Sequence, residues 1–346
     1  MPQPLQGSTV PLVERYDVAL LDLDGVIYVG HDPVPGAADA LTQARSRGMR
    51  LAFVTNNASR TPVEVASLLG KVGVRAETDE IVTSAQAAAR VLAEKLPAGA
   101  RVLVVGADAL RQEVTGRGLA VVASADEEPD AVVQGYAPDT SWRDLAEATV
   151  AVRRGAWWVA TNIDTTLPSA RGALPGNGAL VGVVTAATGA RPLVTGKPEP
   201  ALHRESVDRT GARSPLVVGD RLDTDIEGAN AAGSASMLVL TGVTGADELL
   251  AAEAVHRPTY LAADLTGLLT PHPAPQRESG GGWRCGGWQV SAADDGAVVL
   301  SGTGPDRLDA LRALCAAAWE AGRPPRLRPG GAAATEVAAG FGLTGG

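Results

Sequence analysis

Short apolar runs alternate with amphipathic stretches from Tyr16 to about residue 263. The runs have the length and residue types of buried strands, and the stretches between them carry helix signals. Continuous apolar strands that alternate with helices are typical of parallel sheets covered on both faces. The pattern therefore predicts an α/β protein with a doubly wound parallel sheet. The predicted strands lie at residues 17–24, 50–56, 101–106, 119–124, 130–135, 156–162, 214–220 and 235–242.

The helix after the second run has a clear predicted start. Thr61 can cap it, Pro62 stands at the first helical position, and Glu64 closes a capping box.

The composition changes at residues 269–283, where prolines, charged residues and three successive glycines are typical of a linker. The tail beyond it contains a hairpin signal with Asp295-Gly296 at the turn, and then a helical pattern over about 306–321. We expect this tail to form a small α+β appendage that folds separately.

Composition and charge narrow the class of protein. The 346 residues are 45% hydrophobic and 20% charged, which excludes a disordered chain, a collagen or a coiled coil. The net charge of -9 argues against nucleic-acid binding through a basic face. No apolar run approaches the ~20 residues of a membrane helix, and the N-terminus lacks the pattern of a signal peptide. Cys285 and Cys315 form neither a disulfide framework nor a zinc site. Taken together, these observations predict a cytoplasmic protein without membrane or nucleic-acid partners.

Two carboxylates end the first predicted strand, in the sequence LDLDGV. Asp22 and Asp24 are two positions apart, so they project on the same side of a strand, and their repulsion favours a cation between them. A loop residue followed by an Asp24-Gly25 turn is the structural alternative.

Polar residues also end or follow later strands, where ligands bind in open α/β sheets. Each of these residues also has a purely structural explanation: Thr55 and Asn56 as helix caps, Lys197 as a solvated lysine, and the aspartates as residues at a helix start. Lys197 is one of only three lysines in the chain, which has 27 arginines. The joint occurrence of these residues in order at strand ends favours a common site. They are Thr55, Asn56, Lys197, Asp220, Asp223 and Asp225.

The motifs DLDGV, a strand-end TN, a GKP lysine and GD followed by TD together resemble those of the haloacid dehalogenase superfamily of phosphatases. The resemblance covers about residues 16–265 and implies a Rossmann-like core. It implies that Asp22 is the nucleophile and Asp24 the general acid and base. It also implies a Mg²⁺ site formed by Asp22, the backbone carbonyl of Asp24 and Asp220, with Asp225 in support.

The implied chemistry suits these residue types. Mg²⁺ prefers hard oxygen ligands, and an aspartyl-phosphate intermediate divides a difficult hydrolysis into two easier steps. An acid at Asp24 indicates an oxygen leaving group, because a halide needs no proton. By the same resemblance, Thr55 and Asn56 bind the phosphate and Lys197 neutralises its charge.

Motif spacing indicates where a substrate lid lies. Only 33 residues separate Asp22 from Thr55 and 23 separate Lys197 from Asp220, whereas 142 separate Thr55 from Lys197. An inserted domain therefore lies in the long interval, and its own predicted strands make it an α/β cap. The predicted domains are the core over 1–83 and 186–268, the cap over 84–185, the linker over 269–283 and a C-terminal domain over 284–346.

A C2-type α/β cap resembles that of the NagD-like subfamily, which includes phosphoglycolate and glycerol-phosphate phosphatases. A roofed site favours small substrates because the cap must close to exclude water. We therefore expect Mg²⁺-dependent hydrolysis of a small phosphomonoester, with glycerol 3-phosphate or phosphoglycolate favoured. A phosphotransferase of the same fold and a non-catalytic phosphometabolite-binding protein are the alternatives.

Four cap residues are candidates for substrate contact: Tyr136, Asn162, Asp164 and Arg171. Loop packing explains Tyr136 and Asn162 equally well, a turn explains Asp164, and Arg171 either binds a substrate carboxylate or is solvated.

The tail carries a weaker signal. The segment from Arg328 to Ala333 resembles the R-x-x-G-x-A acetyl-CoA loop of GNAT acetyltransferases, but too few residues remain for that whole fold, so a partial module is predicted. Trp283, Trp288 and Trp319 form either a core or the interface of a homodimer.

Overall fold

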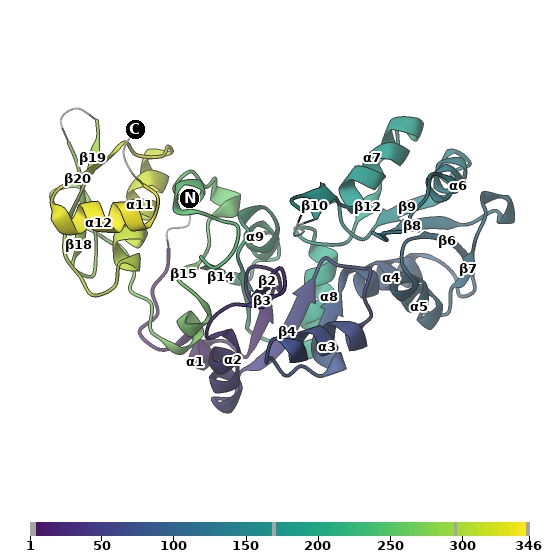
Figure 1. Cartoon of the computed structure of the whole chain (residues 1–346), viewed down its shortest axis with the longest axis horizontal. Helices are drawn as coiled ribbons and strands as arrows, with labels where there is room; N and C mark the ends of the chain where they lie inside the picture. Colours follow the sequence, from purple (N-terminus) through teal and green to yellow (C-terminus); the bar gives the residue numbers. More distant parts are fainter. Residues whose placement is uncertain (1–4, 168–170, 294–295, 344–346) are drawn as a thin grey trace. The chain divides into compact units, whose positions relative to one another are not determined.

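The computed structural model describes residues 5–167, 171–293 and 296–343. The chain divides into two compact units, and Figure 1 labels most of their helices and strands. The first unit contains Met1–Val29, Pro33–Leu51 and Arg213–Gly346, and the second contains Gly30–Asp32 and Ala52–Ala212. None of the helices in the described part of the chain combines the length and apolar character that crossing a bilayer would need.

The first unit contains parallel strands in the order β15-β14-β13-β1. Their interior positions are buried, as the continuous apolar runs predicted. Because the strands are parallel, their carboxyl ends meet at one edge. The strands are β1 (Val18–Leu21), β13 (Pro215–Gly219), β14 (Ala235–Val239) and β15 (Tyr260–Ala262). The helices are α1 (Leu12–Arg15), α2 (Ala37–Ser46), α9 (Glu227–Ala231) and α10 (Ala246–Leu250), with helical turns at Leu222–Ile226, Ala254–His256 and Leu265–Leu269.

The C-terminal part of this unit is a five-stranded sheet with two helices, drawn in yellow and green in Figure 1. β18 and β19 pair in antiparallel fashion, which confirms the predicted hairpin strands, while Asp295 of the predicted turn lies outside the described residues. The strands, in sheet order, are β16 (Gln276–Arg277), β17 (Trp283–Cys285), β18 (Trp288–Ala292), β19 (Val298–Gly302) and β20 (Leu327–Pro329). The helices are α11 (Leu308–Ala321) and α12 (Ala332–Gly340).

The tail packs against the parallel-sheet core, so its separate folding stays a prediction that this packing argues against. Residues of the tail and of the parallel-sheet core share one hydrophobic cluster, in which Trp288 is 2% exposed and Trp319 5% exposed. The indole Nε1 of Trp319 donates to the carbonyl of Leu249 at 3.0 Å, and Arg312 donates to the carbonyl of Leu261 at 2.8 Å. The physical reason is that α11 buries an apolar face against α10 and β15, which a composition change in the linker does not reveal.

The second unit contains a five-stranded parallel sheet in the order β12-β9-β8-β6-β7. Successive residues of β6 face opposite sides: Val102 and Val104 pack with α4 and α5, whereas Leu103 and Val105 pack with α6 and α7. Both faces are therefore covered by helices, as predicted. The strands are β6 (Arg101–Val105), β7 (Ala120–Val122), β8 (Ala131–Gln134), β9 (Trp157–Ala160) and β12 (Leu193–Val194). The helices are α4 (Ser84–Lys95), α5 (Asp108–Gly116), α6 (Trp142–Arg153), α7 (Asn177–Thr188) and α8 (Pro200–Thr210).

Strand β4 (Arg50–Thr55) begins in the first unit and ends in the second, where it pairs in parallel with β5 (Ile81–Thr83). The capping box of α3 (Pro62–Lys71) is confirmed: the hydroxyl of Thr61 accepts from the backbone of Glu64, whose carboxylate accepts from the backbone of Thr61. The remaining short strands are β2 (Tyr28–Val29), β3 (Asp32–Pro33), β10 (Thr166–Leu167) and β11 (Leu174–Pro175).

Strand β12 follows residue 186, where the predicted core resumes, yet it pairs with β9 of the predicted cap. The strand that leads to Lys197 is therefore an edge strand of the cap sheet. The domain boundaries themselves stay a prediction.

Candidate active site

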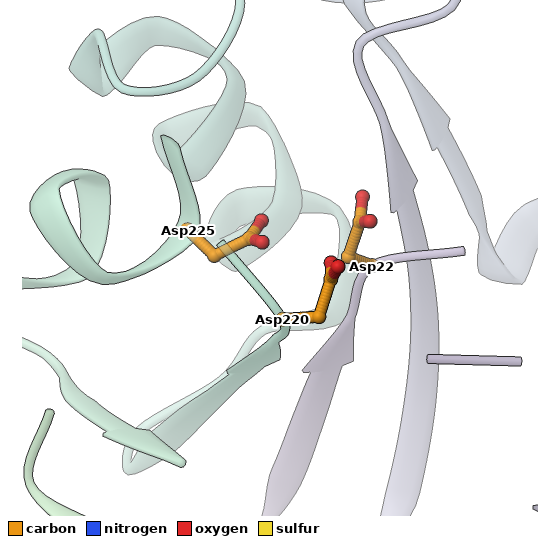
Figure 2. Close-up of side chains that lie close together, drawn as sticks. All are labelled: Asp22, Asp220 and Asp225. Atoms are coloured by element: carbon orange, nitrogen blue, oxygen red, sulfur yellow. The ribbon is translucent and has the colours of Figure 1, made fainter. Parts of the chain in front are cut away.

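Three carboxylates gather where β1 and β13 end. The side chains of Asp22, Asp220 and Asp225 each place an oxygen within 4.8 Å of the others. The register of β1 on β13 brings Asp22 and Asp220 together, and the backbone N–H of Asp22 donates to the carbonyl of Val218 at 2.8 Å. Figure 2 shows Asp22 and Asp220 leaving neighbouring strands on the same side, with the carboxylate of Asp225 directed toward them.

Backbone donors hold two of these carboxylates in place. The N–H of Val243 donates to Oδ2 of Asp220 at 2.7 Å, and the N–H of Arg221 donates to Oδ2 of Asp225 at 3.2 Å. Asp220 and Asp225 are both only 1% exposed. Buried carboxylates that lie this close repel one another unless a cation neutralises them.

Glycines make room for the cluster. A Cβ atom on Gly25 or Gly242 would overlap the carboxylate of Asp220, and one on Gly219 would overlap Asp225. Gly25 also has a φ of +79°, a conformation that favours glycine. This tight cradle of hard oxygen donors fits Mg²⁺, which binds carboxylate oxygens.

Asp24 lies in the turn that follows β1 and is exposed. The turn is closed by the N–H of Gly25, which donates to the carbonyl of Tyr28 at 2.7 Å, and by the hydroxyl of Thr241, which donates to the carbonyl of Gly25 at 2.5 Å. The residue is thus exposed to solvent, whereas Asp220 and Asp225 are buried.

Asp223, also singled out in the sequence, lies in the turn Leu222–Ile226 and is exposed. Burial raises the pKa of its carboxyl, but the hydrogen bond from Arg221, the charge of Arg221 and smaller contributions together outweigh burial and hold the pKa below its usual range. Arg221 and Asp223 form an ion pair at 2.7 Å, which is a structural use of this carboxylate.

The predicted phosphate-binding residues lie in the second unit. Thr55, the last residue of β4, is 7% exposed, and its hydroxyl accepts from the N–H of Asn57 at 3.1 Å. The ammonium group of Lys197 donates to the carbonyl of Val54 at 3.3 Å. The side chain of Asn56 contacts the backbone of Lys197 on two sides, at 2.7 and 3.1 Å. The structure thus brings the strand-end TN motif and the GKP lysine together.

Two of the four predicted cap residues join this group. The side-chain amide of Asn162 donates to the carbonyl of Asn56 at 2.8 Å, and Asn56 in turn donates to Asp164 at 3.3 Å. Tyr136 is half-buried after β8 and Arg171 is exposed, and their roles stay predictions.

Sequence reasoning missed several residues that support the site. The hydroxyl of Ser84 donates to the carbonyl of Asn56 at 2.6 Å, and Asn177 donates to the carbonyl of Asn162 at 2.7 Å. Val243, whose N–H donates to Asp220, follows the predicted strand at 235–242, and the apolar pattern of that strand does not mark the residue as part of a site. For Asn177 the sequence offers one signal: the residue stands between two glycines, Gly176 and Gly178, in the sequence PGNG.

Family models match three stretches of the chain. Residues 19–120 match haloacid dehalogenase-like hydrolase, residues 194–268 match a HAD-hydrolase-like model, and residues 285–343 match a GCN5-related N-acetyltransferase like domain. The last match falls on the tail for which a partial GNAT module was predicted.

Proteins similar to this chain over most of its length are named phosphatases. The D-glycerol 3-phosphate phosphatase of Mycobacterium tuberculosis is 48% identical over 324 residues, which cover 90% of this chain and 88% of that protein. An acid sugar phosphatase of Staphylococcus saprophyticus is 38% identical over 259 residues, 74% of this chain and 98% of its own.

Solved structures give the same picture. The glycerol phosphate phosphatase of Mycobacterium tuberculosis in complex with magnesium is 47% identical, with a TM-score of 0.89 over 97% of this chain and 100% of that one. A p-nitrophenyl phosphatase from Archaeoglobus fulgidus is 31% identical, with a TM-score of 0.68 over 73% of this chain and 98% of its own.

The parallel α/β fold and the carboxylate cluster at its strand ends define a hydrolase with an acidic, metal-binding type of site. The chain belongs to the haloacid dehalogenase-like hydrolases. The fold class, the family and the enzyme class of phosphoric monoester hydrolase are therefore confirmed.

Proposed function

We propose that this enzyme is a Mg²⁺-dependent phosphatase that hydrolyses glycerol 3-phosphate. The proposal rests above all on the cluster of Asp22, Asp220 and Asp225, in a chain that is 48% identical to a D-glycerol 3-phosphate phosphatase over 90% of its length. Phosphoglycolate, the other substrate that the sequence favoured, becomes the competing substrate in the test.

Asp22, Asp220 and the backbone carbonyl of Asp24 would hold the magnesium ion, with Asp225 in support. When bound, the ion offsets the repulsion between an anionic nucleophile and a phosphate dianion. The buried pair Asp220 and Asp225, held by backbone N–H groups, keeps the donor oxygens in position before any ion arrives.

Asp22 acts as the nucleophile. A carboxylate oxygen forms a bond to phosphorus while the bond from phosphorus to the glycerol oxygen breaks, and protonated Asp24 gives its proton to that oxygen. A water molecule then attacks the aspartyl-phosphate. Asp24 takes the proton of that water, the bond between Asp22 and phosphorus breaks, and inorganic phosphate leaves. The exposure of Asp24 supports its part, since it must exchange protons in both steps.

Thr55 and Lys197 supply the groups that bind the transferring phosphoryl oxygens, a hydroxyl and a cation. For Asn56 the structure supports a narrower version of the predicted role. Its side-chain amide is occupied by Lys197 and Asp164, so the group with which it would bind phosphate is its backbone N–H.

Phosphate release tests the proposal. We expect the full-length enzyme to release phosphate from glycerol 3-phosphate with a higher kcat/KM than from phosphoglycolate, and only when Mg²⁺ is present. Asp22→Asn is the matched control that keeps the fold but removes the nucleophile. An added acceptor alcohol that captures the phosphoryl group would identify a phosphotransferase. Binding of glycerol 3-phosphate without turnover would identify a scaffold.

We also infer a cytoplasmic location and a homodimer formed through the C-terminal domain. Cys285 and Cys315 are both free thiols, which is in keeping with a reducing compartment. Trp288 and Trp319 are used in the hydrophobic core, so a dimer interface would have to use the half-buried Trp283 and its neighbours. Light scattering on the full chain tests the dimer, and a monomer mass would reject it.

A further inference from the structure

Asn56 is the centre of a hydrogen-bond network in the second unit. Its Oδ1 accepts from the N–H of Lys197 at 2.7 Å, and its Nδ2 donates to the carbonyl of Lys197 at 3.1 Å and to Oδ2 of Asp164 at 3.3 Å. The partners determine the orientation of the amide, because a backbone N–H only donates and a backbone carbonyl only accepts. No side chain without both a donor and an acceptor would make this pair of contacts.

The chain is built to let Asn56 approach this closely. A Cβ atom on Gly196 would lie 2.6 Å from Oδ1 of Asn56 and would overlap the carbonyl of Thr161. Glycine at 196 is therefore required for the contact. The pairing ties the end of β4 to the loop that carries the lysine, which lies 141 positions away in the sequence.

A second asparagine extends the network into the cap sheet and its helices. Asn162, which is 5% exposed, donates to the carbonyl of Asn56 at 2.8 Å, and its own Oδ1 accepts from the N–H of Asp164 at 3.2 Å. Asn177, the first residue of α7, is 1% exposed and donates to the carbonyl of Asn162 at 2.7 Å. Three asparagines from distant parts of the chain therefore connect β4, the loop after β9 and the start of α7.

We propose that Asn56 is a positioning residue that places Lys197 and Asp164 together, with Asn162 and Asn177 tying both to the start of α7. Lys197 neutralises charge on the phosphoryl group, and Asp164 lies half-buried in the loop after β9. One amide thus sets the spacing between the lysine that binds phosphate and this carboxylate. The inference rests on the proposed function.

The test compares Asn56→Ala with Asn230→Ala. Asn230 is a matched control, because its side chain also donates to two backbone carbonyls, of Val255 at 2.7 Å and of Arg257 at 3.1 Å. We expect Asn56→Ala to lower kcat/KM by about tenfold to a hundredfold through misplacement of Lys197, and to raise the inhibition constant of inorganic phosphate. Asn230→Ala should lower the melting temperature and leave both kinetic constants within about twofold of wild type.

An exchange of the two side chains tests the contact with Asp164. Asn56→Asp places two carboxylates against each other, and we expect it to lose at least as much kcat/KM as Asn56→Ala. Adding Asp164→Asn to Asn56→Asp restores a donor opposite an acceptor and should recover about fivefold or more of the loss. Recovery would tie the loss of kcat/KM to this one contact. If Asn56→Ala does not fold, Asp164→Ala, in a half-buried loop, takes its place and should raise KM more than it lowers kcat.

The proposal is overturned if Asn56→Ala and Asn230→Ala have the same kinetic constants. It is also overturned if the double variant with Asn56→Asp and Asp164→Asn recovers none of the lost kcat/KM. Failure of the proposed function looks different: wild type would then release no phosphate from any phosphomonoester. In that case calorimetric titration with inorganic phosphate still tests whether Asn56 places Lys197. Weaker phosphate binding by Asn56→Ala than by Asn230→Ala supports this placement, and equal binding rejects it.

Discussion

Gly242 lies directly against the carboxylate of Asp220, so that a Cβ atom at position 242 would overlap Oδ2 and Cγ of that aspartate. The contact is made by the loop after β14, whose next residue, Val243, donates its N–H to the same carboxylate at 2.7 Å. The proposed metal ligand is therefore held from behind by a segment that carries no charged group of its own.

Gly242→Ala should push Asp220 out of the carboxylate cluster. We expect the concentration of Mg²⁺ that gives half-maximal activity to rise about tenfold, and much of the activity to return at high Mg²⁺, because the nucleophile is unaffected. Activity titrated against Mg²⁺ measures this. Gly182→Ala is the control, because Gly182 lies in α7 with nothing within 4 Å of its added Cβ atom. A normal Mg²⁺ titration in Gly242→Ala would show that the loop yields to the methyl group.

Asp24→Asn should slow the reaction according to the leaving group. We expect a loss of about 100-fold to 10,000-fold with glycerol 3-phosphate, whose alkoxide needs a proton. The loss in formation of the aspartyl-phosphate should be smaller with p-nitrophenyl phosphate, whose leaving group departs without one. Rapid-quench measurement of the burst phase separates the two half-reactions. Equal losses in that step for the two substrates would contradict a role for Asp24 as the acid.

Lys197→Arg should cost activity although the charge is kept. The ammonium group of Lys197 donates to the carbonyl of Val54 at 3.3 Å, and a planar guanidinium does not fit the position of a compact ammonium. Lys71→Arg is the matched control, since Lys71 is exposed at the end of α3. We expect kcat/KM to fall about tenfold or more only in Lys197→Arg, measured with the same substrate for both variants. Similar kinetics in the two variants would mean that the lysine has no special role.

The buried carboxylate of Glu205 on α8, which is paired with three arginines, predicts that the fold loses stability in acid. Glu205 is 4% exposed and accepts hydrogen bonds from Arg209 at 2.8 Å, Arg90 at 3.2 Å and Arg117 at 3.3 Å. Burial raises the pKa of Glu205, but the hydrogen bonds from Arg209 and Arg90 outweigh it and hold the pKa below its ordinary value of 4.5. A lowered folded pKa means that the carboxylate contributes stability above pH 4.5 and that this contribution is lost as the pH falls through the folded pKa.

Arg90→Ala should therefore lower the melting temperature by about 3 °C or more at pH 7, and the difference from wild type should narrow as the pH falls below 4.5. Thermal melts from pH 7 down to the acid transition measure it. Arg75→Ala removes an exposed pair with Glu77 and is the control. A difference from wild type that stays constant with pH would place the effect in packing rather than in the charge of Glu205.

The tail should unfold together with the parallel-sheet core. Burial, with a smaller contribution from the charge of Asp309, raises the pKa of the Cys285 thiol to about 12, and burial also raises the pKa of Cys315. Both thiols should react with a disulfide reagent only after global unfolding. A chain that ends near Pro275 should melt at a lower temperature or aggregate, because Leu249 and Leu261 lose the tail residues packed against them. Thiol labelling well below the main denaturant transition would instead show a tail that unfolds independently.

Local pattern predicted the elements of the fold well. Each apolar run from 17–24 to 235–242 contains a strand, trimmed at its ends, because burial on both faces of a parallel sheet demands continuous apolar residues that the sequence displays directly. The position of Asp22 at the end of β1 follows from the same pattern, as does the helix start at Thr61. Parallel strands send their carboxyl ends to one edge, so the sequence predicts that Asp220 lies near Asp22.

The sequence by itself determined which residues have the chemistry of a phosphatase and at which strand ends they stand. Only the tertiary structure decided how they are held. The contacts of Asn56 with Lys197, Asn162 and Asp164, and of Gly242 with Asp220, join segments far apart in the chain and follow no period that a sequence displays. The tail shows the same limit: its glycine-rich connection suggested independence, whereas α11 shares its hydrophobic cluster with the core. Periodicity reports which face of an element is apolar, but the partner that covers this face is chosen by the packing of the whole chain.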